Sequence, residues 1–281
     1  MTPQPLTARH AQAAAALTTA SRVTALFATR KPLQPMTEKK LSIITTTYNC
    51  VGDIATYFEA FAALDVSQFD WIVVDAASTD GTTQFLRERA NHFAHFVSEP
   101  DAGFYFGLNK AVASLKTPYY MVFGADDRPS PTLLDDALPL LVASPSLVFG
   151  GVRLMPGGSV KQAGPRCMHR LVWGRAVSHH SVGTIIKTDV HQRHGQYDTA
   201  YALVADGLLL KRVLRSAEPI VRTTVIFGDF RLGGMSSKQE LRSMVETLLL
   251  QLSEGGNPIL QLALFNARMT KRYLLRLFRK A

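Results

Sequence analysis

The stretch Tyr119-Tyr120-Met121-Val122-Phe123-Gly124-Ala125-Asp126-Asp127 decides the fold, because an apolar run ends there in a pair of acids. Two carboxylates at the end of a buried strand repel each other and lose hydration, which costs free energy unless a partner compensates. A divalent metal held by oxygen ligands would offset that cost. The stretch therefore predicts a functional site at this strand end.

Two similar constructions lie upstream. Residues 41–47 form an apolar and threonine-rich run that leads into Tyr48-Asn49, and the apolar run 71–74 leads into Asp75. Helix-like segments separate these runs, as βαβ units require. The carboxyl ends of parallel strands meet at one edge of an open sheet and form a ligand crevice there. The pattern predicts an α/β fold with its site at that edge.

Further motifs follow in a fixed order along the chain. They are Ser42 to Asn49, Val73 to Thr82, Ser98 to Gly103 with Tyr105, Asn109 and Lys110, then Asp126, His179-His180-Ser181-Val182, and Asp206 eight residues after Asp198. The series spans residues 41 to 236 and resembles the inverting nucleotide-sugar glycosyltransferases of the GT-A fold, in glycosyltransferase family 2 of the bacterial polysaccharide type. The resemblance implies a mostly parallel sheet flanked by helices, followed by a C-terminal helical extension.

The same resemblance implies roles for individual residues. Asp126 would bind Mg²⁺ or Mn²⁺, and Asp206 would be the general base. The residues expected to contact the nucleotide are Thr46, Tyr48, Asn49, Asp75, Ser78, Asp80, Lys110 and Asp127. His179 and His180 are weaker candidates for contacts with the acceptor or a phosphate. Two simpler readings stay open: Asp127 as a turn cap, and Asp206 as a favourable charge in the first turn of a helix.

These roles imply a metal-dependent hexosyltransferase. It would move a sugar from a nucleotide diphosphate donor to a glycan or lipid-linked acceptor in cell-surface polysaccharide biosynthesis. Three positions depart from the family pattern: Gly124 replaces a common Asp or Asn, Phe106 a common acid, and His180 the usual Gln. Because Gly124 removes one acid, a catalytically silent scaffold protein of a polysaccharide assembly complex remains the alternative.

Composition agrees with this reading. The chain has 281 residues, 47% of them hydrophobic, and a formal net charge of +9 that suits an anionic partner. Nucleic acid is disfavoured as that partner because the positive charge concentrates in the tails and no aromatic-basic binding motif is evident. The chain has two cysteines, Cys50 and Cys167, which indicates a reducing and therefore cytoplasmic compartment.

The ends of the chain differ from the middle. Residues 1–37 contain no acid and predict a basic, Ala-rich leader that is disordered or precedes a later start at Met36, with the catalytic domain over 38–236. Residues 237–281 predict two helices, the first with a capping box at Ser237 and Glu240. The last is basic and amphipathic, so it would either lie on an anionic membrane surface at the inner face or pack on the domain.

The remaining periodicity predicts individual elements. Helices are expected over Asp53 to Leu64, Thr82 to Ala90, Gly103 to Leu115 and Leu203 to Leu214. Strands are expected over Leu147 to Met155 and Val182 to Lys187.

Overall fold

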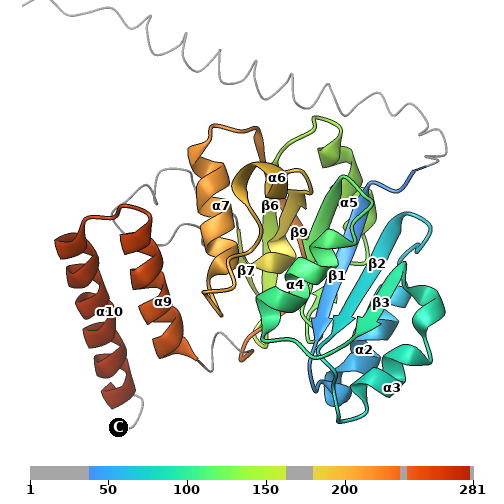
Figure 1. The fold of residues 1–281 in the computed structure, drawn as a ribbon, viewed down its shortest axis with the longest axis horizontal. Coiled ribbons are helices and arrows are strands. Elements are labelled where there is room, and N and C mark those ends of the chain that lie inside the picture. The colour runs from blue at the N-terminus through green and yellow to red at the C-terminus, as the bar shows by residue number, and fades with distance from the viewer. Residues whose placement is uncertain (1–37, 163–179, 235–238, 279–281) are drawn as a thin grey trace, which may run out of the picture. The chain divides into compact units, whose positions relative to one another are not determined.

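Four parallel strands form the half of the sheet that carries the strand-end motifs. In chain order they are β1 (Leu41–Thr47), β2 (Phe69–Asp75), β3 (His95–Ser98) and β4 (Tyr119–Val122). Their order across the sheet is β3-β2-β1-β4 (Figure 1). The register sets Thr47 beside Asp75 and Ile44 beside Val122, so these strands deliver their polar ends to one edge. The computed structural model describes residues 38–162, 180–234 and 239–278.

The second half of the sheet is mixed. Its strands are β5 (Arg128–Pro129), β6 (Leu147–Met155), β7 (Ser159–Lys161), β8 (Thr184–Lys187) and β9 (Ile220–Arg231). Strand β8 runs antiparallel to β4 and to β6, whereas β9 runs parallel to β6. Strands β5 and β7 pair antiparallel with β9 and β6. The predicted α/β fold is confirmed, with fully parallel pairing in the half that holds the motifs.

Helices cover both faces of this sheet. The helices of the described residues are α2 (Val51–Ala62), α3 (Thr82–Arg87), α4 (Phe104–Ala113), α5 (Leu133–Ala137), α6 (Val190–His194), α7 (Ala205–Arg215), α9 (Glu240–Ser253) and α10 (Pro258–Phe278), with 3-10 turns at Ala90–His92, Leu138–Leu141 and Ser181–Gly183. Helices α2, α3 and α5 pack on one face, and α4, α6 and α7 on the other (Figure 1).

Alternating side chains of the central strands supply the two apolar layers. On β1, Ile43 packs with the α2 side and Ile44 with the α4 side. On β2, Trp71 and Ile72 divide in the same way. Successive residues of a strand point to opposite faces, so a strand that is buried on both faces reads as a continuous apolar run. This is why the strand-end motifs stand out in the sequence.

The predicted elements occur with small shifts of their bounds. Helices expected to begin at Asp53 and Leu203 begin at Val51 and Ala205, and the predicted strand Leu147–Met155 is found unchanged. The strand predicted from Val182 begins only at Thr184, because Ser181–Gly183 form a 3-10 turn. The predicted cap Ser237 lies outside the described residues, and the N-cap of α9 is Gln239.

The C-terminal helices attach through polar contacts. Glu246 of α9 is buried, and its carboxylate accepts a hydrogen bond of 2.8 Å from the Leu203 amide. Lys211 of α7 donates to Gln251 of α9 at 2.9 Å. Helix α10 packs against α9, where Arg272 pairs with Glu240 at 3.0 Å (Figure 1). No helix within the described residues is long and apolar enough to cross a membrane.

Candidate active site

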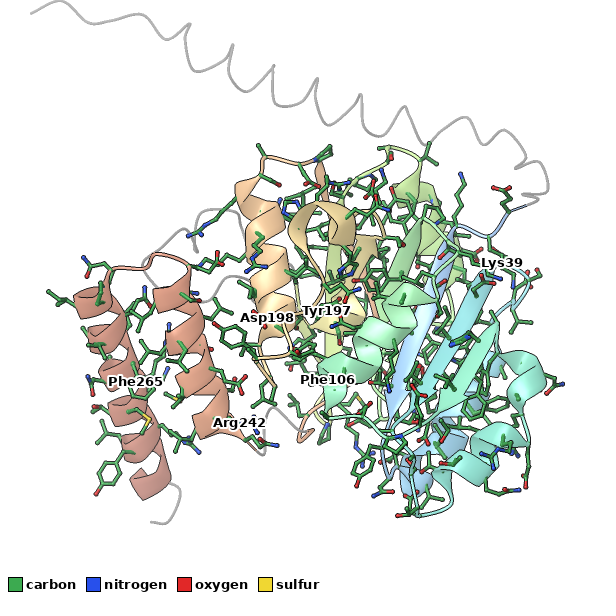
Figure 2. All side chains as sticks on the ribbon, in the orientation of Figure 1. Lys39, Phe106, Tyr197, Asp198, Arg242 and Phe265 are labelled. Carbon is green, nitrogen blue, oxygen red and sulfur yellow. The ribbon has the colours of Figure 1, made fainter. Side chains whose placement is uncertain are left out.

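A cavity of about 1260 Å³ opens at the polar edge of the sheet. The ends of β1 and β4 line it together with the first turns of α4, α7 and α9. Tyr197, which also lines it, lies with Asp198 in the segment leading to α7 (Figure 2), where its ring stacks on Tyr105 of α4. Pockets for drug-sized ligands measure about 300–1,000 Å³, so this cavity has room for a nucleotide sugar and part of an acceptor.

Two of the predicted nucleotide contacts, Thr46 and Tyr48, line the cavity at the end of β1. The Tyr48 side chain is 65% exposed. The Thr46 hydroxyl is buried and has no hydrogen-bond partner among the described residues. A buried polar atom normally has a partner, so the Thr46 hydroxyl is an exception among the described residues.

Asp75, by contrast, is enclosed by protein donors and does not line the cavity. Its carboxylate accepts hydrogen bonds from the hydroxyls of Thr47 at 2.8 Å and Ser78 at 2.6 Å. Further donors are the hydroxyls of Thr83 at 2.6 Å and Ser98 at 2.7 Å and the Ser78 amide at 3.0 Å. Burial acts to raise the pKa of Asp75, but these donors outweigh it and the pKa lies below its usual 3.8.

The predicted residues Asn49, Ser78 and Asp80 join the loops that follow β1 and β2. The Asn49 amide donates to the Ser78 hydroxyl at 2.8 Å, and the Asn49 side-chain oxygen accepts from the Thr79 amide at 2.9 Å. Asp80 accepts from the Val51 amide at 2.9 Å. These residues shape the loop that carries Tyr48, and none of the three lines the cavity.

The Lys110 side chain is also not part of the cavity lining. Its ammonium pairs with Glu99 at 2.9 Å and donates to the Pro100 carbonyl at 3.3 Å. It is not among the residues that line the cavity, although Pro100 is.

The acid pair lies in a tight turn after β4. The Asp127 carboxylate is buried and accepts from the Gly124 amide at 2.8 Å and the Arg231 amide at 3.1 Å. Burial, together with the charge of Asp126, raises the pKa of Asp127 to about 7. Asp127 thus makes the hydrogen bonds of a turn cap while it faces the cavity.

Gly124 lies close to both acids of this turn. A Cβ atom at this position would lie 2.9 Å from Asp126 Oδ1 and 3.1 Å from Asp127 Oδ2. The first contact is too short, so a side chain at position 124 would require the Asp126 carboxylate to move. The glycine that departs from the family pattern therefore permits the position that the Asp126 carboxylate takes in this structure.

The donor set at this turn fits a hard divalent cation. Among the described residues, the Asp126 carboxylate accepts no hydrogen bond, and it lines the cavity. Mg²⁺ is usually held by one or two carboxylates, with water and phosphate oxygens completing its shell. No group of three or more His, Cys, Asp or Glu side chains suited to a metal occurs in the described ranges. Two carboxylates, Asp126 and Asp127, are therefore enough protein ligands for an ion whose other ligands would be phosphate oxygens and water.

Asp206 lines the cavity from the first turn of α7. Its Oδ1 accepts a hydrogen bond of 2.8 Å from the Tyr105 hydroxyl. Burial raises the pKa of Asp206, while the Tyr105 hydroxyl and backbone amides of the first turn partly oppose the shift. A carboxylate with a raised pKa in a cavity is suited to accept a proton.

His180 lines the same cavity, and His179 lies outside the described residues. The His180 ring lies 4.0 Å from the Phe230 ring, and its Nε2 is 3.5 Å from the Lys161 ammonium. Burial, with the charge of Lys161, lowers the pKa of His180 to about 4. The ring is therefore neutral at pH 7 and can donate or accept one hydrogen bond.

Comparison with known proteins decides the family. The sequence profile described as glycosyl transferase family 2 matches residues 42–196, which is more than half of the chain. The chain belongs to glycosyl transferase family 2. It is 23% identical over 206 residues to an uncharacterized glycosyltransferase of Mycobacterium tuberculosis (71% of this chain, 78% of the relative). It is 26% identical over 181 residues to a PGL/p-HBAD biosynthesis glycosyltransferase of Mycobacterium bovis (61% and 68%).

Solved structures share the fold. Residues 1–349 of Staphylococcus aureus TarS, in complex with UDP-GlcNAc, match with a TM-score of 0.61 and 16% identity, covering 80% of this chain and 70% of that one. The mannosyltransferase PcManGT from Pyrobaculum calidifontis, in complex with GDP-Man and Mn²⁺, matches with a TM-score of 0.60 and 19% identity (92% and 77%). The fold of this glycosyltransferase is thus of the GT-A type.

The family match ends before several cavity residues of this glycosyltransferase. Asp206 lies beyond residue 196, as do Glu240 and Ser243 of α9, which line the cavity. Glu240, Ser243 and the Tyr105 hydroxyl were not predicted as site residues from the sequence. Glu240 begins an amphipathic helix, but no sequence signal shows which helix turn faces a cavity. Tyr105 lies within a quoted motif, yet its partner Asp206 is far away in the sequence.

Proposed function

We propose that this glycosyltransferase transfers a sugar from a nucleotide diphosphate to a glycan or lipid-linked acceptor, with a divalent metal and inversion at the anomeric carbon. The observation that carries the proposal is one cavity lined by two carboxylates: Asp126, which accepts no hydrogen bond from the part of the chain that the structure describes, and Asp206 on α7. The M. bovis relative is named for PGL/p-HBAD biosynthesis, and the two solved neighbours are in complex with UDP-GlcNAc and GDP-Man. We assign the reaction to cell-surface polysaccharide or glycolipid synthesis.

On the donor side, Thr46 and Tyr48 would contact the nucleotide. Asp126 and Asp127 would hold Mg²⁺ or Mn²⁺. When bound, the ion stabilises the negative charge that grows on the departing diphosphate. Asn49, Asp75, Ser78 and Asp80 then serve the nucleotide indirectly, because their hydrogen bonds shape the loops around it.

On the acceptor side, Asp206 would take the proton of the attacking hydroxyl. The hydroxyl oxygen forms a bond to the anomeric carbon, and the bond to the diphosphate oxygen breaks with its electron pair. A single displacement of this kind inverts the anomeric centre and needs only one carboxylate base. His180, neutral at pH 7, is placed to hydrogen-bond the acceptor or a phosphate.

A thermal-shift panel tests the donor side. We expect one nucleoside diphosphate, with UDP and GDP tried first, to raise the melting temperature in Mn²⁺ and not in EDTA, because a ligand of the native state stabilises it by mass action. Asp126→Ala should abolish this shift. Asp135→Ala removes an exposed acid that does not line the cavity, and it should keep the shift. An equal shift in EDTA would refute the metal role.

Turnover separates an enzyme from a silent scaffold. We expect slow release of UDP or GDP from UDP-GlcNAc or GDP-mannose with water as acceptor, stimulated by Mn²⁺. Metal-dependent binding of every nucleotide sugar without any release would favour the scaffold. Proton NMR coupling of the sugar product gives its anomeric configuration, and retention would exclude the inverting mechanism.

We also propose that α10 associates with an anionic membrane surface. Its outer face exposes Ile259, Leu262, Tyr273 and Leu274, and the sequence after Glu254 has Lys and Arg residues but no acid. Exposed apolar side chains beside basic ones favour binding to anionic lipid. Deleting residues 267–281 should release the protein from vesicles containing phosphatidylglycerol and spare donor hydrolysis. Equal vesicle binding by the truncated protein would exclude this role.

A further inference from the structure

The Tyr105 phenol contacts Asp206, the proposed base, directly. Its hydroxyl donates to Asp206 Oδ1 at 2.8 Å, across 101 positions of sequence. Among the described residues, no other side chain hydrogen-bonds Asp206. The contact joins the first turn of α4 to the first turn of α7, so it depends on the packing of two helices on the same face of the sheet.

The Tyr105 ring is held in place. The side chain is 4% exposed, and its ring stacks on Tyr197 at 5.6 Å with an interplanar angle of 27°. Tyr197 is fixed in turn, because its hydroxyl is 2.7 Å from that of Tyr120. The Tyr120 hydroxyl is also 2.7 Å from Nε2 of His191. A ring confined in this way keeps its hydroxyl aimed at Asp206.

This hydrogen bond acts on the charge state of the carboxylate. Burial disfavours the ionised form of Asp206, and a donated hydrogen bond favours it. Tyr105 itself stays protonated, because burial and the negative charge of Asp206 raise its pKa well above 10. The phenol is therefore a permanent donor that never competes for the proton of an acceptor. It uses Oδ1 and leaves Oδ2 to accept.

We propose that Tyr105 is a positioning residue that orients the Asp206 carboxylate and keeps it ionised as a general base. This inference rests on the proposed function of Asp206. The proton of the acceptor hydroxyl passes to Oδ2, the oxygen attacks the anomeric carbon, and the diphosphate leaves with the electron pair of the broken bond. Tyr105 retains its own proton throughout.

Other titratable groups near Asp206 define the controls. Burial, together with the negative charge of Asp206, raises the pKa of the phenols of Tyr197, in the segment before α7, and of Tyr120 on β4. His191 of α6 is hydrogen-bonded to the Tyr120 hydroxyl. Lining the same cavity on other elements are His180, Glu240, Asp101, Asp126 and Asp127. Tyr120 does not line the cavity, so Tyr120→Phe removes a buried phenol of the network without removing a hydrogen bond to Asp206.

The test measures the pKa of Asp206 in the full chain without any ligand. A ¹³C NMR titration of aspartate carboxyls is assigned by the signal that Asp206→Asn lacks. A hydrogen bond to a charged group contributes about 1.5–3 kcal/mol, so Tyr105→Phe should raise this pKa by about one to two units. Tyr120→Phe should lower thermal stability and leave the pKa of Asp206 near its wild-type value.

Donor hydrolysis provides the second readout. With UDP-GlcNAc or GDP-mannose as donor, Tyr105→Phe should shift the acidic limb of the pH profile of kcat to higher pH, by the same one to two units as the pKa of Asp206. Activity should be about ten- to a hundredfold lower below that limb, following the loss of ionised base, and recover at higher pH. The KM for the donor should not change. A purely structural role would instead lower kcat at every pH.

The outcomes are separable. An unchanged Asp206 pKa in a folded Tyr105→Phe protein overturns the inference. If Tyr105→Phe does not fold, site-specific 3-fluorotyrosine at position 105 keeps the ring packing and strengthens the donor, and it should lower the Asp206 pKa. No shift there also overturns the inference. An Asp206→Asn enzyme with near-normal kcat instead refutes the proposed function, whatever Tyr105 does to the pKa.

Discussion

The proposed nucleotide and acceptor sides of the site each contain an acid at the start of a loop or helix, Asp75 and Asp206, but the hydrogen-bond donors around the two acids differ. Asp75 accepts five hydrogen bonds from nearby hydroxyls and an amide, whereas Asp206 accepts one from a side chain, Tyr105. The Asp75 carboxylate has little capacity left to accept hydrogen bonds, whereas the Asp206 carboxylate can accept more. A buried acid is thus recognised as structural or reactive by the donors around it, rather than by its burial.

The pKa shifts of the two acids express the same difference. The donors around Asp75 lower its pKa in spite of burial, while burial prevails at Asp206 and raises its pKa. A lowered carboxyl pKa means that the ionised form stabilises the fold, and a raised one means that ionisation costs stability. Ionisation of Asp206 therefore costs stability, which is consistent with its proposed role as a general base.

Removing Asp206, the proposed general base, should produce the largest effect. General bases contribute about 10² to 10⁴ in rate, so Asp206→Asn should lower turnover of a nucleotide sugar by that factor. Donor and metal binding should stay near wild type, since Asp206 contacts neither in the proposed mechanism. Steady-state kinetics with calorimetric binding of the nucleoside diphosphate measures both quantities. If the turnover rate of Asp206→Asn lies within threefold of wild type, Asp206 is not the general base, and the proposed functional difference between Asp75 and Asp206 is wrong.

Removing Asp75 should damage the fold instead. In Asp75→Ala, the hydroxyls of Thr47, Ser78, Thr83 and Ser98 lose a charged acceptor, and a buried polar group without a partner costs about 1–3 kcal/mol. We expect urea unfolding to show a loss of about 2–4 kcal/mol. The exposed acid Asp135, changed to Ala, should lose less than about 0.5 kcal/mol. Full stability of Asp75→Ala would show that its hydrogen bonds are dispensable.

The pH dependence of stability should have opposite signs at the two acids. The stabilising contribution of Asp75 is present above its usual pKa of 3.8 and is lost as the pH falls through its lower folded value. The contribution of Asp206 is present below 3.8 and is lost as the pH rises through its raised value. The free energy of unfolding of Asp75→Asn should therefore approach that of wild type as the pH falls. The free energy of unfolding of Asp206→Asn should rise relative to wild type as the pH increases toward neutral. If urea unfolding shows a difference from wild type that is the same at every pH for both variants, both assignments are contradicted.

The smallest effect should come from the α9 wall. Glu240 lines the cavity and pairs with Arg272, but it is an exposed acid. Because exposed pairs contribute about 0–1 kcal/mol, Glu240→Gln should change stability by less than about 1 kcal/mol and leave the affinity for the nucleoside diphosphate unchanged. A tenfold weaker nucleotide affinity would mean that α9 belongs to the donor side.

The sequence predicted the fold well because its strands are buried on both faces. Runs such as 71–74 remain apolar throughout, and each ends in a polar residue that marks the sheet edge. The same local signal could not separate Asp75 from Asp126, since both follow such runs while their surroundings come from other loops. Nor could it connect Tyr105 with Asp206, or place Glu240 at the cavity. These contacts depend on packing between segments far apart in the chain, which periodicity does not encode.

The way α9 is attached bears on how such an enzyme can diversify. Much of its link to α7 is a set of separate hydrogen bonds and ion pairs, among them Lys211 with Gln251 and Arg215 with Glu254, while the two large apolar clusters lie on the two faces of the sheet. A lineage could therefore inherit the half of the sheet formed by β1 to β4 unchanged and acquire a new C-terminal hairpin by recombination near residues 235–238. Each such exchange would bring a different wall to the acceptor end of the cavity and, with it, a different range of sugars to extend.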